Sequence, residues 1–333
     1  MVPPGHFVSA LPRIGFVHIP KTAGMSVRAA LEQHYPAGQV GATRFDDRLF
    51  GAFTAFHTFA PGLRAETLLP SDPVPTDADR PLQLGHLSLQ GMCRLVPVDR
   101  VVTFLREPRA RLLSHHLYWA VRPADQNEAF GEYQVQRHAA GGLAGFLGAD
   151  AAAHQHDNLQ CRMLVDEPGL IPPDRPIDPA HHAEVAALAL AALDSLGHVG
   201  LVEDPAMWTR LGAWAGLPTA SVRTNVTEAG EQPIRFTGPQ LTPETVAMVE
   251  ARSAADLIVY RAVVARVLGH DAGDPAAFAD RQFVSQAERY GRVVAAAEAA
   301  RDAGATPPAA LPPHTPPAAP APAGRRPSRW RRR

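Results

Sequence analysis

The feature that most constrains the fold is a strand, a turn and a helix that follow one another near the start of the chain. Residues 13–19 (Arg-Ile-Gly-Phe-Val-His-Ile) form an almost continuous apolar run, which is typical of a buried strand. Residues 20–24 contain a proline and a glycine and predict a tight turn. Residues 26–33 then place their apolar side chains at helical spacing. This order of elements is the opening of an α/β unit.

Strands and helices continue to alternate along the chain. A helix is expected to begin at Pro108, because proline favours the first turn of a helix. Residues 125–160 are polar and glycine-interrupted and predict short helices and loops, and residues 60–81 predict a surface loop. This alternation predicts an α/β fold with a central parallel sheet flanked by helices. The apolar patterns predict further strands over residues 82–89, 101–105 and 198–202, and further helices over residues 183–193, 206–215, 242–268 and 283–300.

The composition predicts one folded domain between two terminal segments. The chain has 333 residues, enough for a sizeable core. Residues 1–12 contain three prolines and no apolar stretch of the kind found in a signal peptide. Proline and alanine dominate from Thr306 to Ala323, and arginines surround Trp330, a composition that cannot bury a core. We therefore expect an N-terminal segment over residues 1–12, a domain over residues 13–301 and a disordered tail over residues 302–333.

Charge and hydropathy limit the expected partners and location. The formal net charge is −1, so the chain as a whole gives no indication of a nucleic-acid binder. No run of about 18 apolar residues predicts a transmembrane helix, and a cytoplasmic protein is expected. Two interpretations stay open for the arginine-rich end. It is either a solvated tail without a partner or a segment that contacts acidic lipid or another polyanion.

The cysteines and histidines form no pattern of metal ligands. Cys93 and Cys161 are far apart in sequence and predict two buried thiols in a reducing compartment. The chain contains no His-Glu-x-x-His motif, and no metal is expected.

The turn after the first predicted strand contains the only lysine of the chain. Lysine and arginine together number 32, and every one except Lys21 is arginine. Lysine presents a compact point charge on a flexible stem, whereas arginine presents a planar fork. A single lysine among so many arginines indicates a position that arginine cannot serve, although chance could also have placed it there.

This turn has the properties of a phosphate-binding loop. Backbone N–H groups at the start of a helix point toward an anion, and the helix dipole favours negative charge there. Ala23 and Gly24 allow the backbone to approach a ligand closely, Thr22 and Ser26 offer hydroxyl groups, and Lys21 offers a mobile positive charge. Because the lysine precedes the glycine, the loop is not a Walker loop. The alternative is an ordinary turn between a strand and a helix.

A second segment with anion-binding residues follows the predicted strand at residues 101–105. Arg106 comes directly after this strand and can offer a bidentate fork to a phosphate. Ser114 lies two turns into the next helix and can offer its hydroxyl to the same group. Arg111, between them, is interpreted as a structural residue that pairs with a carboxylate.

The two segments, in this order and about 80 residues apart, resemble the donor site of sulfotransferases that use 3'-phosphoadenosine 5'-phosphosulfate. The sequence His-Ile-Pro-Lys-Thr-Ala-Gly-x-Ser is similar to the corresponding motif of the carbohydrate-type family, which includes heparan sulfate 2-O-sulfotransferases and bacterial relatives. The resemblance implies a P-loop-like three-layer sandwich and an acceptor hydroxyl, favouring one on a carbohydrate. It also implies donor-binding roles for Lys21, Thr22, Ala23, Gly24, Met25, Ser26, Arg106 and Ser114, with Lys21 neutralising the leaving phosphate oxygen.

The segment from Val101 to Ser114 resembles the 3'-phosphate site of the family. His86 is the candidate general base, because the family carries a Gly-His before the strand that leads to this site. The family can show a second histidine two positions earlier, where this chain has Leu84. A histidine without a catalytic role is the alternative for His86, and His18 is expected to be structural because it lies within the first strand. His115 and His116 are weaker candidates for the base.

Two other functions remain possible from the sequence. A nucleotide-dependent phosphotransferase would need a magnesium site and a standard Walker loop, neither of which the sequence contains. A non-catalytic nucleotide-binding relative would keep the fold and bind the donor without turnover.

Overall fold

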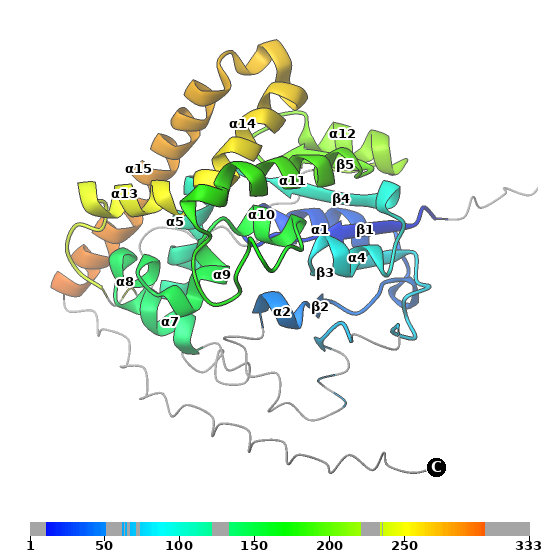
Figure 1. The fold of residues 1–333 in the computed structure, drawn as a ribbon, viewed down its shortest axis with the longest axis horizontal. Coiled ribbons are helices and arrows are strands. Elements are labelled where there is room, and N and C mark those ends of the chain that lie inside the picture. Colours follow the sequence, from blue (N-terminus) through cyan, green and yellow to red (C-terminus); the bar gives the residue numbers. More distant parts are fainter. Residues whose placement is uncertain are drawn as a thin grey trace, which may run out of the picture.

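A five-stranded parallel sheet lies at the centre of the part of the chain that the structure, a computed structural model, describes (Figure 1). The described residues are 11–50, 62, 64, 67–70, 74–121, 133–220, 234 and 236–303. The strand order is β2-β3-β1-β4-β5, and each neighbouring pair is parallel. The strands are β1 (Ile14–Val17), β2 (Arg44–Phe45), β3 (Leu82–His86), β4 (Val101–Leu105) and β5 (His198–Leu201).

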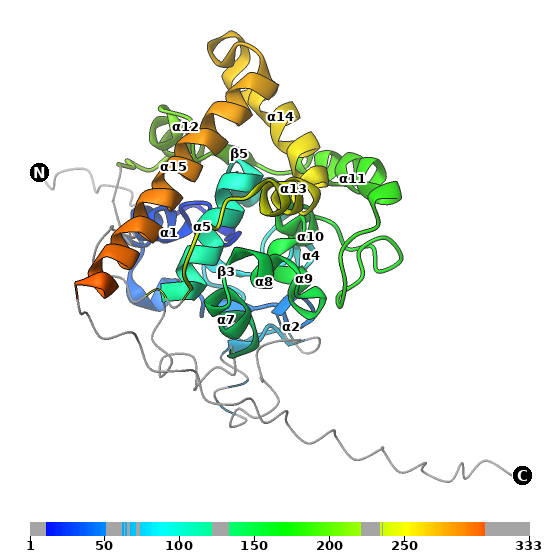
Figure 2. The same ribbon diagram turned by 90° about the vertical axis from the view of Figure 1, so that its left-hand side faces the viewer.

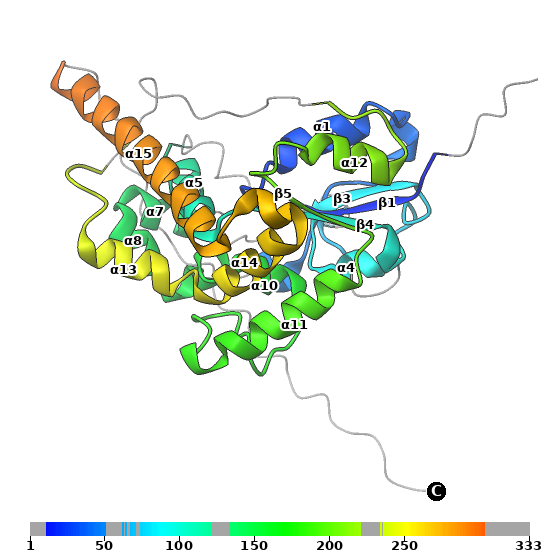
Figure 3. The ribbon, with the colours of Figure 1, turned by 90° about the horizontal axis from the view of Figure 1, so that it is seen from above.

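Helices cover both faces of this sheet, which confirms the predicted three-layer α/β sandwich. Helices α1 (Gly24–Glu32) and α12 (Met207–Ala215) lie on one face, and α4 (Leu89–Cys93), α10 (Leu159–Leu164) and α11 (His182–Asp194) lie on the other (Figure 3). Side chains alternate between the two faces of a strand, so Phe16 packs with the α1 layer while Val17 packs with the other layer. The two apolar clusters formed in this way bury both faces of the sheet.

Most elements predicted from apolar patterns are confirmed. The strand at residues 101–105 has the predicted ends, and α5 (Pro108–Val121) begins at the predicted proline. The strand β2 and the helix α2 (Asp47–Phe50) were not predicted, because two strand residues are too few to show an alternating pattern. Cys93 is exposed and only Cys161 is buried, so the prediction of two buried thiols is wrong for Cys93.

The single helix predicted over residues 242–268 is wrong, because two helices, α13 (Pro243–Ala251) and α14 (Ala254–Leu268), occupy this segment. Asn158 causes the break by inserting its own hydrogen-bonding groups. Its backbone N–H donates to the carbonyl of Arg252 at 2.7 Å, and its Oδ1 accepts from the N–H groups of Ala255 and Asp256 at 2.8 and 3.2 Å. The tertiary contact therefore supplies the cap that starts α14.

The region between α5 and α11 contains short helices, as predicted. They are α7 (Tyr133–Ala140), α8 (Leu143–Leu147), α9 (Ala153–His156) and α10. The last helix, α15 (Pro275–Asp302), lies alongside α5 (Figure 2). It begins before the predicted residue 283, because Asp274 accepts hydrogen bonds from the N–H groups of Ala276 and Ala277.

Several predictions concern residues outside the described part of the chain. These are the N-terminal segment before Leu11 and the tail beyond Ala303. None of the described helices combines the length and the apolar character needed to cross a membrane.

Replacing Asn158 with alanine is expected to destabilise the protein by about 1–3 kcal/mol, because two buried N–H groups lose their acceptor. Alanine also tolerates the left-handed backbone of this position (φ 45°) less well than asparagine does. Urea unfolding of Asn158→Ala and wild type measures the difference. A loss below about 0.5 kcal/mol, the size typical of a neutral surface substitution, would show that other contacts hold the break.

Candidate functional site

The loop between β1 and α1 has an unusual backbone. Lys21 and Ala23 both take left-handed conformations, with φ of 70° and 60°. A non-glycine residue in this region costs of the order of 1–3 kcal/mol, and such strain clusters at ligand-binding sites. The hydroxyl of Thr22 donates to the carbonyl of Ile19 at 2.9 Å, so this side chain braces the loop from within. The sequence showed where the loop lies but did not show that its conformation is strained.

The loop and the first turn of α1 present backbone N–H groups. Within the described residues, none of the N–H groups of Ala23, Gly24 and Met25 donates to a protein acceptor. N–H groups at the start of a helix are suited to an anion, and the dipole of α1 adds to the attraction. The three amides lie within the stretch expected to bind the 5'-phosphate.

Gly24 is required by its neighbour rather than by its own backbone conformation. A Cβ atom at this position would lie 1.7 Å from Nε2 of His18. The His18 ring therefore fills the space beside the start of α1. It also stacks on Phe16, with ring centroids 5.4 Å apart. The prediction that His18 lies within the first strand is wrong, because β1 ends at Val17, but the ring has the packing of a structural residue.

Lys21 presents a positive charge that no acidic side chain of the described residues neutralises. Its Nζ lies 4.7 Å from the centroid of the Tyr118 ring, a cation–π contact. Among the described residues, no carboxylate lies within ion-pair distance of this ammonium group. Burial, together with the positive charges of Arg106 and Arg289, lowers the pKa of Lys21 to about 8.

Arg106 joins the two predicted segments. Its Nη1 donates to the carbonyl of Lys21 at 3.2 Å, so the two segments meet at the edge of the sheet where β1 and β4 end. Strands β1 and β4 are neighbours and parallel, but their following connections lead to opposite sides of the sheet. This is the topological switch point, where α/β folds generally place their ligands. Lys21 and Arg106 thus lie together where β1 and β4 end.

Ser114 and Tyr118 lie on the partly exposed face of α5. They are four residues apart, so their side chains are neighbours on the helix surface. Tyr118 contacts the ammonium group of Lys21, so Ser114 lies one helical turn from a residue in contact with Lys21. Arg111 is fully buried on the same helix. Burial lowers the pKa of Arg111 to about 10 although Asp256 raises it, and the predicted pairing with a carboxylate is not found among the described residues, because Nη1 of Arg111 lies 3.4 Å from Nδ1 of His115 instead.

His86 is held with one ring nitrogen free. Its Nδ1 lies 2.7 Å from the carbonyl oxygen of His18, and because a carbonyl only accepts, Nδ1 carries the proton. Nε2 is therefore the acceptor atom of a neutral ring. Burial lowers the pKa of His86 to about 4, so the ring is neutral at pH 7. The ring centroids of His86, at the end of β3, and His18, directly after the neighbouring β1, are 4.2 Å apart.

The long helix α15 supplies residues that the sequence analysis did not single out. Gln286 accepts a hydrogen bond at 2.9 Å from Nη2 of Arg106. Arg289 lies close enough to lower the pKa of both Lys21 and Arg106. No sequence motif identifies Gln286 or Arg289, because the periodicity of a helical sequence indicates only which face of the helix is apolar.

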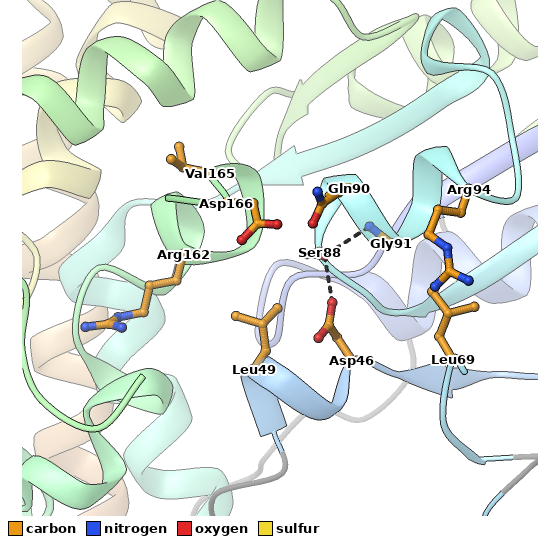
Figure 4. A pocket seen from close by; sticks show the side chains of 10 residues that line it. All are labelled: Asp46, Leu49, Leu69, Ser88, Gln90, Gly91, Arg94, Arg162, Val165 and Asp166. Atoms are coloured by element: carbon orange, nitrogen blue, oxygen red, sulfur yellow. Dashed lines mark hydrogen bonds between the residues drawn. The ribbon is translucent and has the colours of Figure 1, made fainter. Parts of the chain in front are cut away.

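A separate cavity lies on the α4 side of the sheet (Figure 4). Its volume is about 300 Å³, and Asp46 accepts a hydrogen bond from Ser88 at 2.7 Å in its wall. Leu49, Gln90 and Asp166 lie around the same space in Figure 4. None of the predicted donor-binding residues lines this cavity.

No protein-family model matches this chain, and no curated protein matches it in sequence.

Replacing Gly24 with alanine is expected to destabilise the protein by about 1–3 kcal/mol, the usual cost of overpacking. The new Cβ would overlap the His18 ring. The double variant Gly24→Ala/His18→Ala should recover part of the loss, because it removes the overlapping atoms. Gly38→Ala is the matched control, since a Cβ there meets no atom within 4 Å. Thermal unfolding of the four proteins tests this, and an unaffected Gly24→Ala variant would contradict the packing.

Stability is expected to fall in acid because of the neutral His86 ring. Its pKa is about 4 in the folded protein and 6.5 ordinarily, so between these values only the unfolded chain binds this proton. The contribution of the neutral His86 ring to the free energy of unfolding is fully present above pH 6.5 and is lost as the pH falls toward 4. His86→Phe should reduce the slope of unfolding free energy against pH by up to about 1.4 kcal/mol per unit. Urea unfolding from pH 7 to 4.5 measures the slope, with the exposed His270→Phe as control. An unchanged slope in His86→Phe would exclude this origin.

Proposed function

We propose that this chain is a sulfotransferase that transfers a sulfuryl group from 3'-phosphoadenosine 5'-phosphosulfate to a hydroxyl group of an acceptor. The observation that carries the proposal is the ammonium of Lys21, set in a strained loop beside three N–H groups, where the described part of the chain supplies neither a carboxylate for the ammonium nor acceptors for the N–H groups. A half-buried cation without an acidic partner is costly, and a bound anion offsets that cost. The resemblance of the loop and of the Arg106 segment to the sulfotransferase donor site selects the sulfated nucleotide among possible anions.

The residues present fit such a donor. The N–H groups of Ala23, Gly24 and Met25 would hold the 5'-phosphate, and Arg106 with Ser114 would hold the 3'-phosphate. Arg106 has N–H groups beyond the two that bind Lys21 and Gln286, because a guanidinium carries five. The donor would supply the activated sulfuryl group and a phosphate leaving group.

Each side chain then has a task in the transfer. Negative charge develops on the leaving oxygen as the bond to sulfur breaks, and the Lys21 ammonium stabilises that charge. The free Nε2 of His86 takes the proton of the acceptor hydroxyl. The resulting imidazolium keeps its Nδ1 hydrogen bond to the carbonyl of His18, which favours the charged ring. Arg106 and the amides position the donor so that the two oxygens lie in line.

The acceptor is proposed to be a carbohydrate hydroxyl, on the basis of the resemblance alone. Calorimetry with 3'-phosphoadenosine 5'-phosphate tests donor binding, and mass spectrometry after incubation with the sulfated donor and a panel of hydroxyl acceptors tests turnover. Magnesium-dependent transfer from ATP in the same assay would favour the phosphotransferase alternative. Tight nucleotide binding without any product would favour the non-catalytic relative.

Lys21→Ala is expected to reduce turnover by at least about a hundredfold, the scale seen on removing one preorganised donor. Donor affinity should fall less, because the amides and Arg106 remain and the contact is strongest in the transition state. Lys21→Arg should also be poor, because a planar fork does not replace a compact ammonium. Steady-state kinetics and calorimetry measure both effects.

Arg100→Ala is the matched control for this experiment. Arg100 is an exposed cation at the opposite end of β4, so its loss should leave turnover unchanged. Full activity in Lys21→Arg would show that the single lysine is an accident of composition. Normal turnover in Lys21→Ala would refute the proposed site.

A further inference from the structure

Two arginines that follow β4 are bound in opposite ways, although they are only three residues apart. Arg109 forms ion pairs with three carboxylates, at 2.6 Å to Glu107, 2.8 Å to Glu250 and 2.9 Å to Asp280. Its positive charge is therefore fully compensated within the protein. This cluster, in which Arg109 and Glu107 are buried while the side chains of Glu250 and Asp280 are partly exposed, joins α5 to α13 and α15 and leaves no charge for a ligand.

Arg106 contacts neutral oxygens instead. Its two terminal nitrogens donate to the carbonyl of Lys21 and to the side-chain amide of Gln286. Its backbone N–H and carbonyl are both bound by the side chain of Gln160, at 3.0 Å each. Glu203 raises the pKa of Arg106, but burial, which lowers it, has the larger effect, and Oε1 of Glu203 accepts from the N–H of Glu107. The described residues form no ion pair with Arg106, although the nearby carboxylates of Glu203 and Glu107 both raise its pKa.

Gln286 is held firmly where it meets Arg106. Its side chain is buried, with 8% of the residue exposed. One turn later on α15, the hydroxyl of Tyr290 lies 2.9 Å from Nδ1 of His116 on α5. Nearly two turns earlier, Asp280 pairs with Arg109, also on α5. Because α15 is attached to α5 on both sides of Gln286, the contact with Arg106 belongs to a fixed arrangement.

We propose that Gln286 is a positioning residue of the anion site, which fixes Arg106 and, through it, the strained carbonyl of Lys21, while leaving both positive charges available to an anion. A carboxylate at this position would hold the guanidinium equally well but would cancel its charge. The amide oxygen of Gln286 therefore holds the guanidinium without neutralising its charge, whereas a glutamate would do both. This inference rests on the anion site of the proposed function and is independent of the identity of the acceptor.

The charge that α15 brings to the site supports this role. Arg289 lies three residues after Gln286 and therefore on the same side of the helix. Its positive charge lowers the pKa of both Lys21 and Arg106. Helix α15 thus adds a cation to the anion site and contacts Arg106 without adding a negative charge there.

The variant Gln286→Glu tests the inference, because it keeps the shape of the side chain and changes only its charge. Gln282→Glu is the matched control, which adds the same charge one turn away on the same helix. Calorimetry measures the affinity for inorganic pyrophosphate and for 3'-phosphoadenosine 5'-phosphate, and thermal unfolding measures stability. We expect Gln286→Glu to be at least as stable as wild type and to bind both anions at least about tenfold more weakly. Gln282→Glu should stay within about twofold of wild type, since it is further from the site.

Equal affinity of Gln286→Glu and wild type for pyrophosphate would overturn the inference. Gln286→Met removes the acceptor without adding charge, and it should weaken anion binding less than Gln286→Glu does. Equal weakening in these two variants would show that the neutral charge of Gln286 has no role, and would also overturn the inference. Failure of wild type to bind the nucleotide while it binds pyrophosphate would refute the proposed function alone, because the comparison with pyrophosphate still tests Gln286. Failure to bind either anion would refute both.

Discussion

The hydrogen bond from Arg106 to the carbonyl of Lys21 connects the parts of the structure on which the candidate site depends. Strand β4 ends directly before Arg106, and the loop after the neighbouring β1 contains Lys21, so parallel pairing brings the two residues to one edge. The carbonyl that Arg106 binds belongs to a residue with a left-handed backbone. Such a conformation persists only where its surroundings hold it. A single guanidinium therefore joins the sheet, the strained loop and the last helix.

The charges of this region are arranged for a ligand rather than for stability. Neither Lys21 nor Arg106 forms an ion pair with a carboxylate of the described residues, and burial of the two charges has a cost, as the lowered pKa values of both groups indicate. Arg109, three residues after Arg106, shows the alternative arrangement, in which three carboxylates compensate the positive charge of a buried arginine. The chain thus contains acidic residues able to neutralise a cation here and places them beside the arginine that does not face the loop. An anion at the switch point would complete the compensation.

The rings of His18 and His86 pack together at the same edge of the sheet. The ring of His18 occupies the space that a side chain at position 24 would need, and its carbonyl oxygen selects the tautomer of His86. The second histidine expected two positions before His86 is Leu84 in this chain, yet an imidazole from the adjacent strand lies against His86. Both rings are neutral at pH 7, because burial lowers the pKa of each. A neutral ring with a free Nε2 is the form that can accept a proton.

The sequence by itself determined the local elements and the position of the loop. Apolar runs marked β1 and β4 because strands buried on both faces have no polar side, and the single Lys21 marked the loop between β1 and α1. Only the tertiary structure decided the rest. Asn158 breaks a segment whose own pattern is helical, and Gln286 reaches Arg106 across 180 residues of sequence. Periodicity reports which side of an element is apolar, whereas caps, strain and charge compensation depend on groups that only the folded chain brings together.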